Sequence, residues 1–319
     1  MRLKRLLLAL CATGAVIVLG VSSTPATAAT CDDEYTGQEE IMHPGRFGWA
    51  YQENWSNKEI PLAGQVGCIP ESWGLPVNIN LSLLPHPYEI GGVKDQSPAP
   101  LEITANTTVL TDAARPSAIK NLDLSGDGFL QVGSGNELTL ATATAGGSAT
   151  GLLGPGTIRI PTGATLNLIE RGPSFGDALQ LLNSGTINVG HEGGPTLESA
   201  SGTPARLVNT GTVAITGRAS IGRGAEEPGP ELINDGNMLV NETLADGVAF
   251  VNHGTVAIAP GKLFEVPSIT GGGTVAVGTG AFSVQSAYEP VGNPVISLEI
   301  VIVKKKGKKH PEEHHVGSI

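Results

Sequence analysis

The segment 207–215, LVNTGTVAI, decides the fold of this chain because it recurs with small changes along most of the sequence. In each copy a Gly-Thr pair is followed by residues that alternate between aliphatic and small or polar, the pattern of a half-buried β-strand. The copies recur at intervals of about 20 to 30 residues, the size of one supersecondary unit rather than of a domain. The related segments are 152–160, 181–189, 232–240, 250–258 and 268–277.

One such unit cannot bury its own aliphatic face, so successive units must stack and share a core. Aromatic residues make up only 4% of the chain, so small aliphatic side chains must fill that core, and 44 glycines supply corners between short strands. The sequence therefore predicts an all-β fold, with a parallel β-solenoid over residues 101–303.

Asparagine occupies one position of the turn before the strand in the middle units. At that position Asn tolerates a left-handed backbone, and the Gly that follows is expected to supply a positive φ. Stacked units would align these amides into a ladder that hydrogen-bonds from coil to coil. The expected ladder consists of Asn183, Asn209, Asn234 and Asn252, and the ends of the series substitute Gly154 and Thr270 or Gly271.

The two ends of the chain differ from the repeats. Residues 1–29 combine basic residues, an apolar run and a small-residue cleavage site, the pattern of a secretory signal peptide. Removal of this segment leaves Cys31 and Cys68, which predict one disulfide in an oxidising compartment. Residues 30–100 hold all three Trp and are expected to form a disulfide-tied cap and first coil that cover the strand edges. Residues 304–319 are predicted to be a basic, disordered tail.

The charge balance excludes some partners. The formal net charge is −11, and removal of the basic signal residues makes the remainder more acidic. An acidic surface repels nucleic acid, so nucleic-acid binding is not expected. The apolar run 295–303 is too short to span a bilayer, so no transmembrane segment is predicted.

Repeated Asn-x-Gly-Thr units behind a signal peptide resemble the β-strand-repeat surface proteins of bacteria, including haemagglutinin-like adhesins and autotransporter passengers. Residues 54–56 (NWS) with Pro61 and the strand 65–70 are similar to the opening of such solenoids, and residues 280–300 to their closing coil. The resemblance implies a right-handed parallel β-helix. It also implies a secreted, extracellular or cell-surface protein of structural or adhesin-like, non-catalytic type. The expected partners are a cell-wall or extracellular polysaccharide or a host surface protein. Neither a translocator β-barrel after the repeats nor a Leu-Pro-x-Thr-Gly sorting motif is recognised in the sequence.

A polysaccharide lyase or glycoside hydrolase is the alternative, because parallel β-helices also carry such enzymes. Their sites need two or three carboxylates on adjacent coils, often with a neighbouring Arg or Lys. The candidates are Glu170 with Arg171, Asp177, Glu192, Glu198, and Glu226 and Glu227 with Arg218 and Arg223. They do not recur at one register, and most fall in the insertions 190–203 and 217–230. We therefore favour solvated loops and predict no catalytic residue; the insertions are the expected variable binding surface.

Residues 123–128, DLSGDG, start like a calcium-binding loop, with candidate ligands Asp123, Ser125 and Asp127. The twelfth position is Ser134, where such a loop has a bidentate Glu. A turn between strands is the preferred interpretation, and calcium stays an alternative. No other cofactor is predicted.

Three further groups have two interpretations each. Trp49, Tyr51, Trp55 and Trp73 could stack on sugars, although large aromatics in a small cap more often fill its core. The tail contains His310, His314 and His315, which could bind a transition metal weakly. The lysines within 304–309 could tether the protein to an anionic polymer or could serve only to keep the tail soluble. His253 varies a turn position and is interpreted as a tolerated polar residue.

Overall fold

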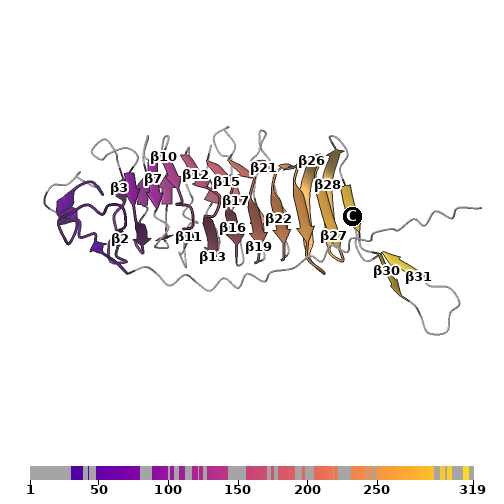
Figure 1. Cartoon of the computed structure of the whole chain (residues 1–319), viewed down its shortest axis with the longest axis horizontal. Helices are drawn as coiled ribbons and strands as arrows, with labels where there is room; N and C mark the ends of the chain where they lie inside the picture. Colours follow the sequence, from indigo (N-terminus) through magenta and orange to yellow (C-terminus); the bar gives the residue numbers. More distant parts are fainter. Residues whose placement is uncertain are drawn as a thin grey trace, which may run out of the picture.

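The computed structural model shows an all-β chain (Figure 1). Strands of successive coils stack along one axis and form long parallel sheets. The residues that the structure describes are 30–38, 42, 48–79, 88–99, 101–103, 108–111, 117–120, 122–124, 128–142, 156–170, 174–175, 179–190, 196–197, 205–217, 219–221, 231–242, 244–246, 249–290, 295–298, 300–303 and 312–315.

Sheet 1 is a parallel ladder that runs from the N-terminal region to near the C-terminal end of the solenoid. Its strands, in spatial order, are β1 (Asp33–Glu34), β2 (Val66–Ile69), β5 (Gly92–Asp95), β8 (Ser117–Ile119), β11 (Glu137–Thr142), β13 (Thr165–Glu170), β16 (Thr186–Val189), β19 (Thr212–Ile215), β22 (Asn237–Val240), β25 (Thr255–Ile258), β27 (Thr274–Gly278) and β29 (Val295–Leu298).

Sheet 2 is the second parallel ladder, and the chain alternates between the two. Its central strands are β4 (Tyr88–Ile90), β7 (Thr108–Thr111), β10 (Gly128–Gln131), β12 (Gly156–Ile160), β15 (Gln180–Asn183), β18 (Arg206–Asn209), β21 (Glu231–Asn234), β24 (Ala249–Asn252), β26 (Leu263–Gly271) and β28 (Ala281–Pro290). The short strands β20 (Ala219–Ile221) and β23 (Leu244–Asp246) join it through β26.

Shorter ladders complete the coils. Sheet 3 consists of β3 (Val77–Ile79), β6 (Leu101–Ile103) and β9 (Leu122–Leu124), and β14 (Ser174–Phe175) pairs with β17 (Thr196–Leu197). All these pairings are parallel and keep corresponding residues in register. The predicted all-β fold and parallel β-solenoid are therefore confirmed.

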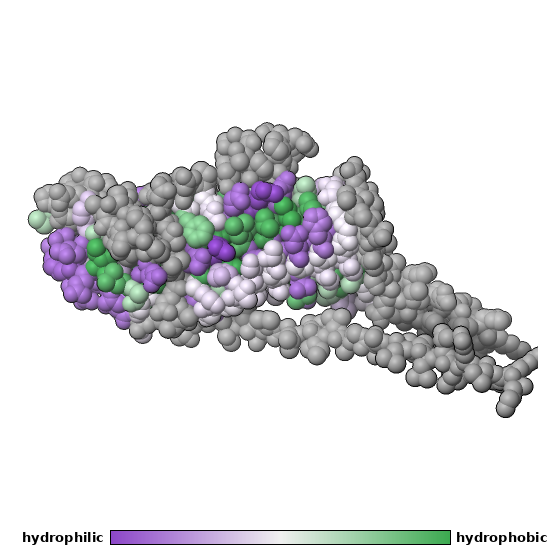
Figure 2. Space-filling view, turned by 45° about the horizontal axis from the view of Figure 1, so that its top comes forward, coloured by the Kyte–Doolittle hydropathy of each residue, from purple (hydrophilic) through white to green (hydrophobic). Residues whose placement is uncertain are grey.

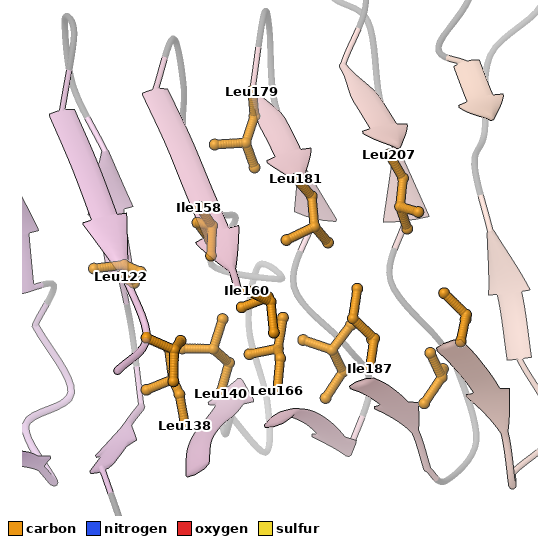
Figure 3. Close-up of a cluster of buried hydrophobic side chains, with 14 of the residues drawn as sticks. Leu122, Leu138, Leu140, Ile158, Ile160, Leu166, Leu179, Leu181, Ile187 and Leu207 are labelled. Atoms are coloured by element: carbon orange, nitrogen blue, oxygen red, sulfur yellow. The ribbon is translucent and has the colours of Figure 1, made fainter. Parts of the chain in front are cut away.

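The core is a continuous column of aliphatic side chains between the sheets (Figure 3). Most strands of the middle coils alternate buried residues with more exposed ones, as Leu181 and Leu207 do with their outward neighbours. Burial of one such side chain contributes about 1.5 to 3 kcal/mol. Because each coil shares this core with the coils above and below, a single coil has little stability of its own.

The Asn-x-Gly corner joins sheet 2 to sheet 1 in the middle coils, and its asparagines stack. The Nδ2 of Asn183 donates to Asn209 Oδ1 at 2.7 Å, Asn209 donates to Asn234 Oδ1 at 2.8 Å, and Asn234 donates to Asn252 Oδ1 at 2.8 Å. All four side chains are buried. The same Nδ2 atoms also donate to backbone carbonyls of the next coil, as Asn209 does to Asn237 O at 3.0 Å. The amides therefore bind coil to coil.

A glycine stands two residues after each asparagine of the ladder, because the corners of adjacent coils nearly touch there. A Cβ on Gly211 would lie 2.2 Å from the Gly185 carbonyl oxygen, and one on Gly236 would lie 2.3 Å from that of Gly211. No side chain fits into such a gap, so this glycine is required by close approach rather than by a positive φ.

The first predicted repeat, 152–160, was aligned incorrectly. Gly156 opens β12 in sheet 2, opposite Gly128, whereas Gly185, Gly211, Gly236 and Gly254 each lie between a strand of sheet 2 and a strand of sheet 1. Ile160, not Gly154, lies opposite Asn183. The corner after β12 is longer than the Asn-x-Gly corner and contains Gly163 at φ +84°. The turn of this coil is therefore built differently from the turns of the Asn-x-Gly coils.

The N-terminal segment is tied by the predicted Cys31–Cys68 disulfide, whose Cα atoms lie 5.7 Å apart. Trp49 and Trp55 are fully buried and pack edge to face with ring centroids 4.5 Å apart, while Tyr35 packs edge to face on Trp55. These aromatics fill the interior of the segment, whereas Trp73 and Tyr51 are partly exposed. The first three strands of sheet 1, β1, β2 and β5, already lie inside the segment expected to be cap and first coil.

The C-terminal end contains one element that was not expected. Strand β31 (Glu312–His315) pairs antiparallel with β30 (Ile300–Val303), so these four residues of the tail have regular structure. Residues 1–29, 304–311 and 316–319 lie outside the described residues, and with them the lysines of 304–309 and His310. Among the described residues, no helix has the length and apolar character needed to cross a membrane.

Candidate binding faces

The outward face of sheet 1 carries a column of hydroxyl groups. Thr186 lies in register with Thr212, and after Asn237 the column continues with Thr255 and Thr274. Thr165 stands before Thr186 at the N-terminal side. All these side chains are partly or fully exposed. Since parallel strands lie about 4.8 Å apart, the column offers one polar group at that interval along the solenoid.

A second column runs beside the first and consists of Asn188, Ala214, Leu239, Ala257 and Ala276 in register; all of them are at least partly exposed except Ala214, which is buried. Asn188 donates to Asn167 Oδ1 at 2.8 Å, which extends the column to β13. Leu239 is 37% exposed, although it is a large hydrophobic residue. From β16 to β27 the two columns contain no ionisable side chain. This face can therefore form hydrogen bonds and van der Waals contacts, but its residues have no group that would exchange a proton near neutral pH.

An acidic column lies on the outward face of sheet 3. Asn78, Glu102 and Asp123 occupy neighbouring positions on β3, β6 and β9. Asn78 Nδ2 donates to Glu102 Oε2 at 3.0 Å. Burial raises the pKa of the Asp123 carboxyl above its usual range, and the negative charge of Glu102 raises it further. A carboxyl group with a raised pKa next to a second carboxyl group is an arrangement that general acid–base catalysis can use.

Sequence reasoning missed Glu102, although a signal existed. The segments Leu101–Ile103 and Leu122–Leu124 share the pattern apolar, acidic, apolar, and both apolar positions are buried. Two such short strands in successive coils place their acidic residues side by side. The pattern went unnoticed because these coils lack the Asn-x-Gly marker used to align the others.

The calcium hypothesis gains no support from the described residues. Asp123 lies within β9, with its side chain in the acidic column, and Ser125 and Asp127 lie outside the described residues. Within the parts of the chain that the structure describes, no three His, Cys, Asp or Glu residues gather in a way that could hold a metal ion.

Most of the carboxylates considered for catalysis lie outside the residues that the structure describes. Glu170 ends β13, but its side chain is not described. The other members of that set also lie outside the described residues, namely Arg171, Asp177, Glu192, Glu198, Arg218, Arg223, Glu226 and Glu227.

His253 lies at an exposed corner rather than in a catalytic set. Its Nδ1 is 2.8 Å from Asp235 Oδ1 on the preceding coil. Both side chains are about half exposed, at 55% and 41%, so the pair contributes little to stability. His314 and His315 belong to β31, and their side chains are not described.

Comparison with known proteins adds no relative. No family model matches the chain, and no curated protein or solved structure matches it. Function must therefore be argued from the faces themselves.

Proposed function

We propose that this protein is a secreted or surface-associated, non-catalytic solenoid that binds an extended polysaccharide through the outward face of sheet 1. The observation that carries the proposal is the pair of uncharged columns, one of Thr and Asn and one of Asn, Ala and Leu, repeated in register from β16 to β27.

A polysaccharide suits such a face for two reasons. Sugars present hydroxyl groups next to apolar C–H surfaces, and the two columns offer hydrogen-bonding groups next to methyl groups. A polymer lying along the solenoid axis would meet the same two groups at every coil. Many weak contacts on one polymer then add up, because each later contact forms at a high effective concentration.

Secretion or surface location rests on sequence features and one structural fact that agrees with them. Residues 1–29 have the pattern of a signal peptide, and the Cys31–Cys68 disulfide suits an oxidising compartment. The resemblance to adhesin-like repeat proteins points in the same direction.

Binding to insoluble polysaccharides tests the proposal. The purified protein is incubated with a panel such as cellulose, chitin, peptidoglycan and a mannan, and the bound fraction is measured. The double variant Thr212→Lys, Thr255→Lys places two long cations on the proposed face. We expect its affinity for the preferred polymer to fall at least about tenfold.

The matched control is Thr157→Lys, which adds the same side chain to the outward face of β12 in sheet 2. This variant should bind like the parent protein. Equal loss in both variants, or no binding of the parent to any polymer of the panel, would overturn the proposal.

The acidic column supports a second candidate function, a polysaccharide lyase or hydrolase. Glu102 and Asp123 lie side by side on adjacent coils, and the pKa of Asp123 is raised. A reducing-end assay on the same panel, with and without calcium, tests it. Cleavage by the parent that is lost in both Glu102→Gln and Asp123→Asn would favour the enzyme, whereas cleavage that persists in both variants would place the activity elsewhere.

A further inference from the structure

Sheet 2 carries an apolar stripe on its outward face. Leu182, Val208, Ile233 and Val251 stand in register on β15, β18, β21 and β24. Each alternates with a buried core residue and is itself partly exposed. Figure 2 shows a green band of this kind along the solenoid, with purple hydrophilic residues on both sides.

Polar residues flank the stripe in register on either side. On one side Arg206 and Glu231 form an ion pair at 2.8 Å, with side chains 41% and 39% exposed. On the other side Thr210 and Asp235 are exposed at the corner. Water therefore reaches both members of the ion pair, and each can contact a second molecule.

We propose that this stripe is the interface of a two-fold dimer in which two copies of the chain pack sheet 2 against sheet 2 with their solenoid axes antiparallel. The two-fold axis runs parallel to the strands, between β18 and β21. Val208 then faces Ile233 of the second copy, and Leu182 faces Val251 of the second copy. Sheets that pack face to face in this way keep their strand directions nearly aligned.

Charge selects this arrangement. The same axis places Arg206 opposite Glu231 of the second copy, and Thr210 opposite Asp235 of the second copy. Both contacts occur twice, because a two-fold interface uses one patch on both chains. The alternative two-fold axis, along the solenoid, would place Glu231 opposite Asp235 of the second copy. Two carboxylates of like charge would then face each other, which opposes association.

The size of the patch sets the expected strength. The four residues of the stripe span three strand spacings of about 4.8 Å, so the stripe is roughly 14 Å long between its outermost residues. Even with the strands on either side, the contact would bury on the order of 500 Å² per copy, against about 800 Å² in a typical stable interface. The dimer should therefore be weak and should dissociate on dilution.

Exchange of the two charges tests the dimer directly. Sedimentation velocity over a wide range of protein concentration follows the parent protein, R206E, E231R and an equimolar mixture of the two variants. The parent should shift from monomer to dimer as concentration rises. Each single variant places like charges opposite each other across the axis and should dimerise at least about tenfold more weakly.

The mixture separates the contact between chains from the ion pair within a chain. In a mixed dimer the introduced glutamate of the R206E chain faces the introduced arginine of the E231R chain. The unchanged Glu231 of the first chain faces the unchanged Arg206 of the second, so both contacts between chains are restored. The ion pair within each chain stays broken. We expect the mixture to dimerise close to the parent affinity.

Two controls accompany the measurement. Circular dichroism melting curves show that each variant is folded, and K120E makes the same charge change away from sheet 2 and should dimerise like the parent. A parent protein that stays monomeric at every concentration, or a mixture that associates no better than the single variants, would overturn the proposal.

Discussion

Two columns of polar side chains in this solenoid are both built by stacking one residue per coil in register. In one column the side chains hydrogen-bond to each other, and in the other two carboxyl groups lie side by side. The buried ladder from Asn183 to Asn252 repeats a neutral amide at each coil, and each of the first three amides donates to the oxygen of the next. The outward column on sheet 3 stacks Asn78, Glu102 and Asp123, and there the pKa of Asp123 is raised by burial and by Glu102.

The difference shows what in-register stacking requires of a side chain. An amide has both a donor and an acceptor, so identical amides at each coil satisfy one another. A carboxylate only accepts hydrogen bonds, so neither of two carboxylates at the same register can donate to the other. Their negative charges also repel. Parallel stacking therefore favours repeated neutral groups and penalises repeated charges of one sign.

The largest effect should follow from the introduction of a charge into the ladder. Asn209→Asp removes the Nδ2 that donates to Asn234 Oδ1 and to Asn237 O, and places a carboxylate against both oxygens. Because the site is buried, we expect the free energy of unfolding to fall by about 3 to 5 kcal/mol near neutral pH. Urea denaturation measured by circular dichroism checks this.

Asn209→Ala is the matched control for that variant. It also removes the donor but adds no charge, so its cost should be smaller, about 2 kcal/mol. At acidic pH the difference in free energy of unfolding between the two variants should become smaller. The buried carboxyl of Asn209→Asp then binds a proton and loses its charge. Equal losses at neutral pH would show that charge is not what the ladder rejects.

A smaller loss should follow from Gly211→Ala, which separates close approach from amide bonding. Its Cβ would meet the Gly185 carbonyl oxygen at 2.2 Å, so the corners of two coils must move apart. We expect a loss of about 2 to 3 kcal/mol in urea denaturation. Gly261→Ala is the control, because nothing lies within 4 Å of its Cβ although its φ is +70°. That change should cost about 1 kcal/mol. A loss at Gly211 no larger than at Gly261 would contradict the tight-corner explanation.

The contrast also explains how far the sequence predicts this molecule. The ladder could be anticipated because Asn stands two residues before Gly in each middle unit. Residues at the same place in successive parallel coils lie above one another, so these asparagines must form one column. The segment 152–160 was misaligned because a Gly-Thr pair can open a strand as well as follow a corner, and only the pairing of Gly156 with Gly128 distinguishes the two.

The outward faces were harder to anticipate than the core. Glu102 and Asp123 become neighbours only once the lengths of the N-terminal coils are known, and those coils lack the repeat marker. The aliphatic stripe of sheet 2 was hidden for another reason. Leu182 and Val208 stand next to core leucines in the sequence, so a continuous apolar pair gives no sign of which residue points outward.

The smallest effect, and the only gain, should come from the acidic column. Asp123→Asn replaces a carboxyl whose pKa is raised in the folded protein by burial and by Glu102. A raised folded-state pKa means that the folded protein binds the proton more tightly than the unfolded chain does. The stability that protonation contributes is present below the ordinary pKa of 3.8 and is lost as pH rises through the raised value. Near neutral pH the ionised carboxylate therefore destabilises the fold.

The variant should gain about 0.5 kcal/mol at neutral pH, a modest value because Asp123 is partly exposed and water screens its charge. The gain should shrink as pH falls through the raised pKa of Asp123, because the carboxyl of the parent then binds a proton. Glu102→Gln removes only the second cause of the shift and should give a smaller gain, while its Oε1 can still accept the hydrogen bond from Asn78. Thermal melts of the three proteins at several pH values measure both trends. A gain that grows on acidification would mean that Asp123 is stabilised as a carboxylate, and that in-register stacking of these two acids is tolerated after all.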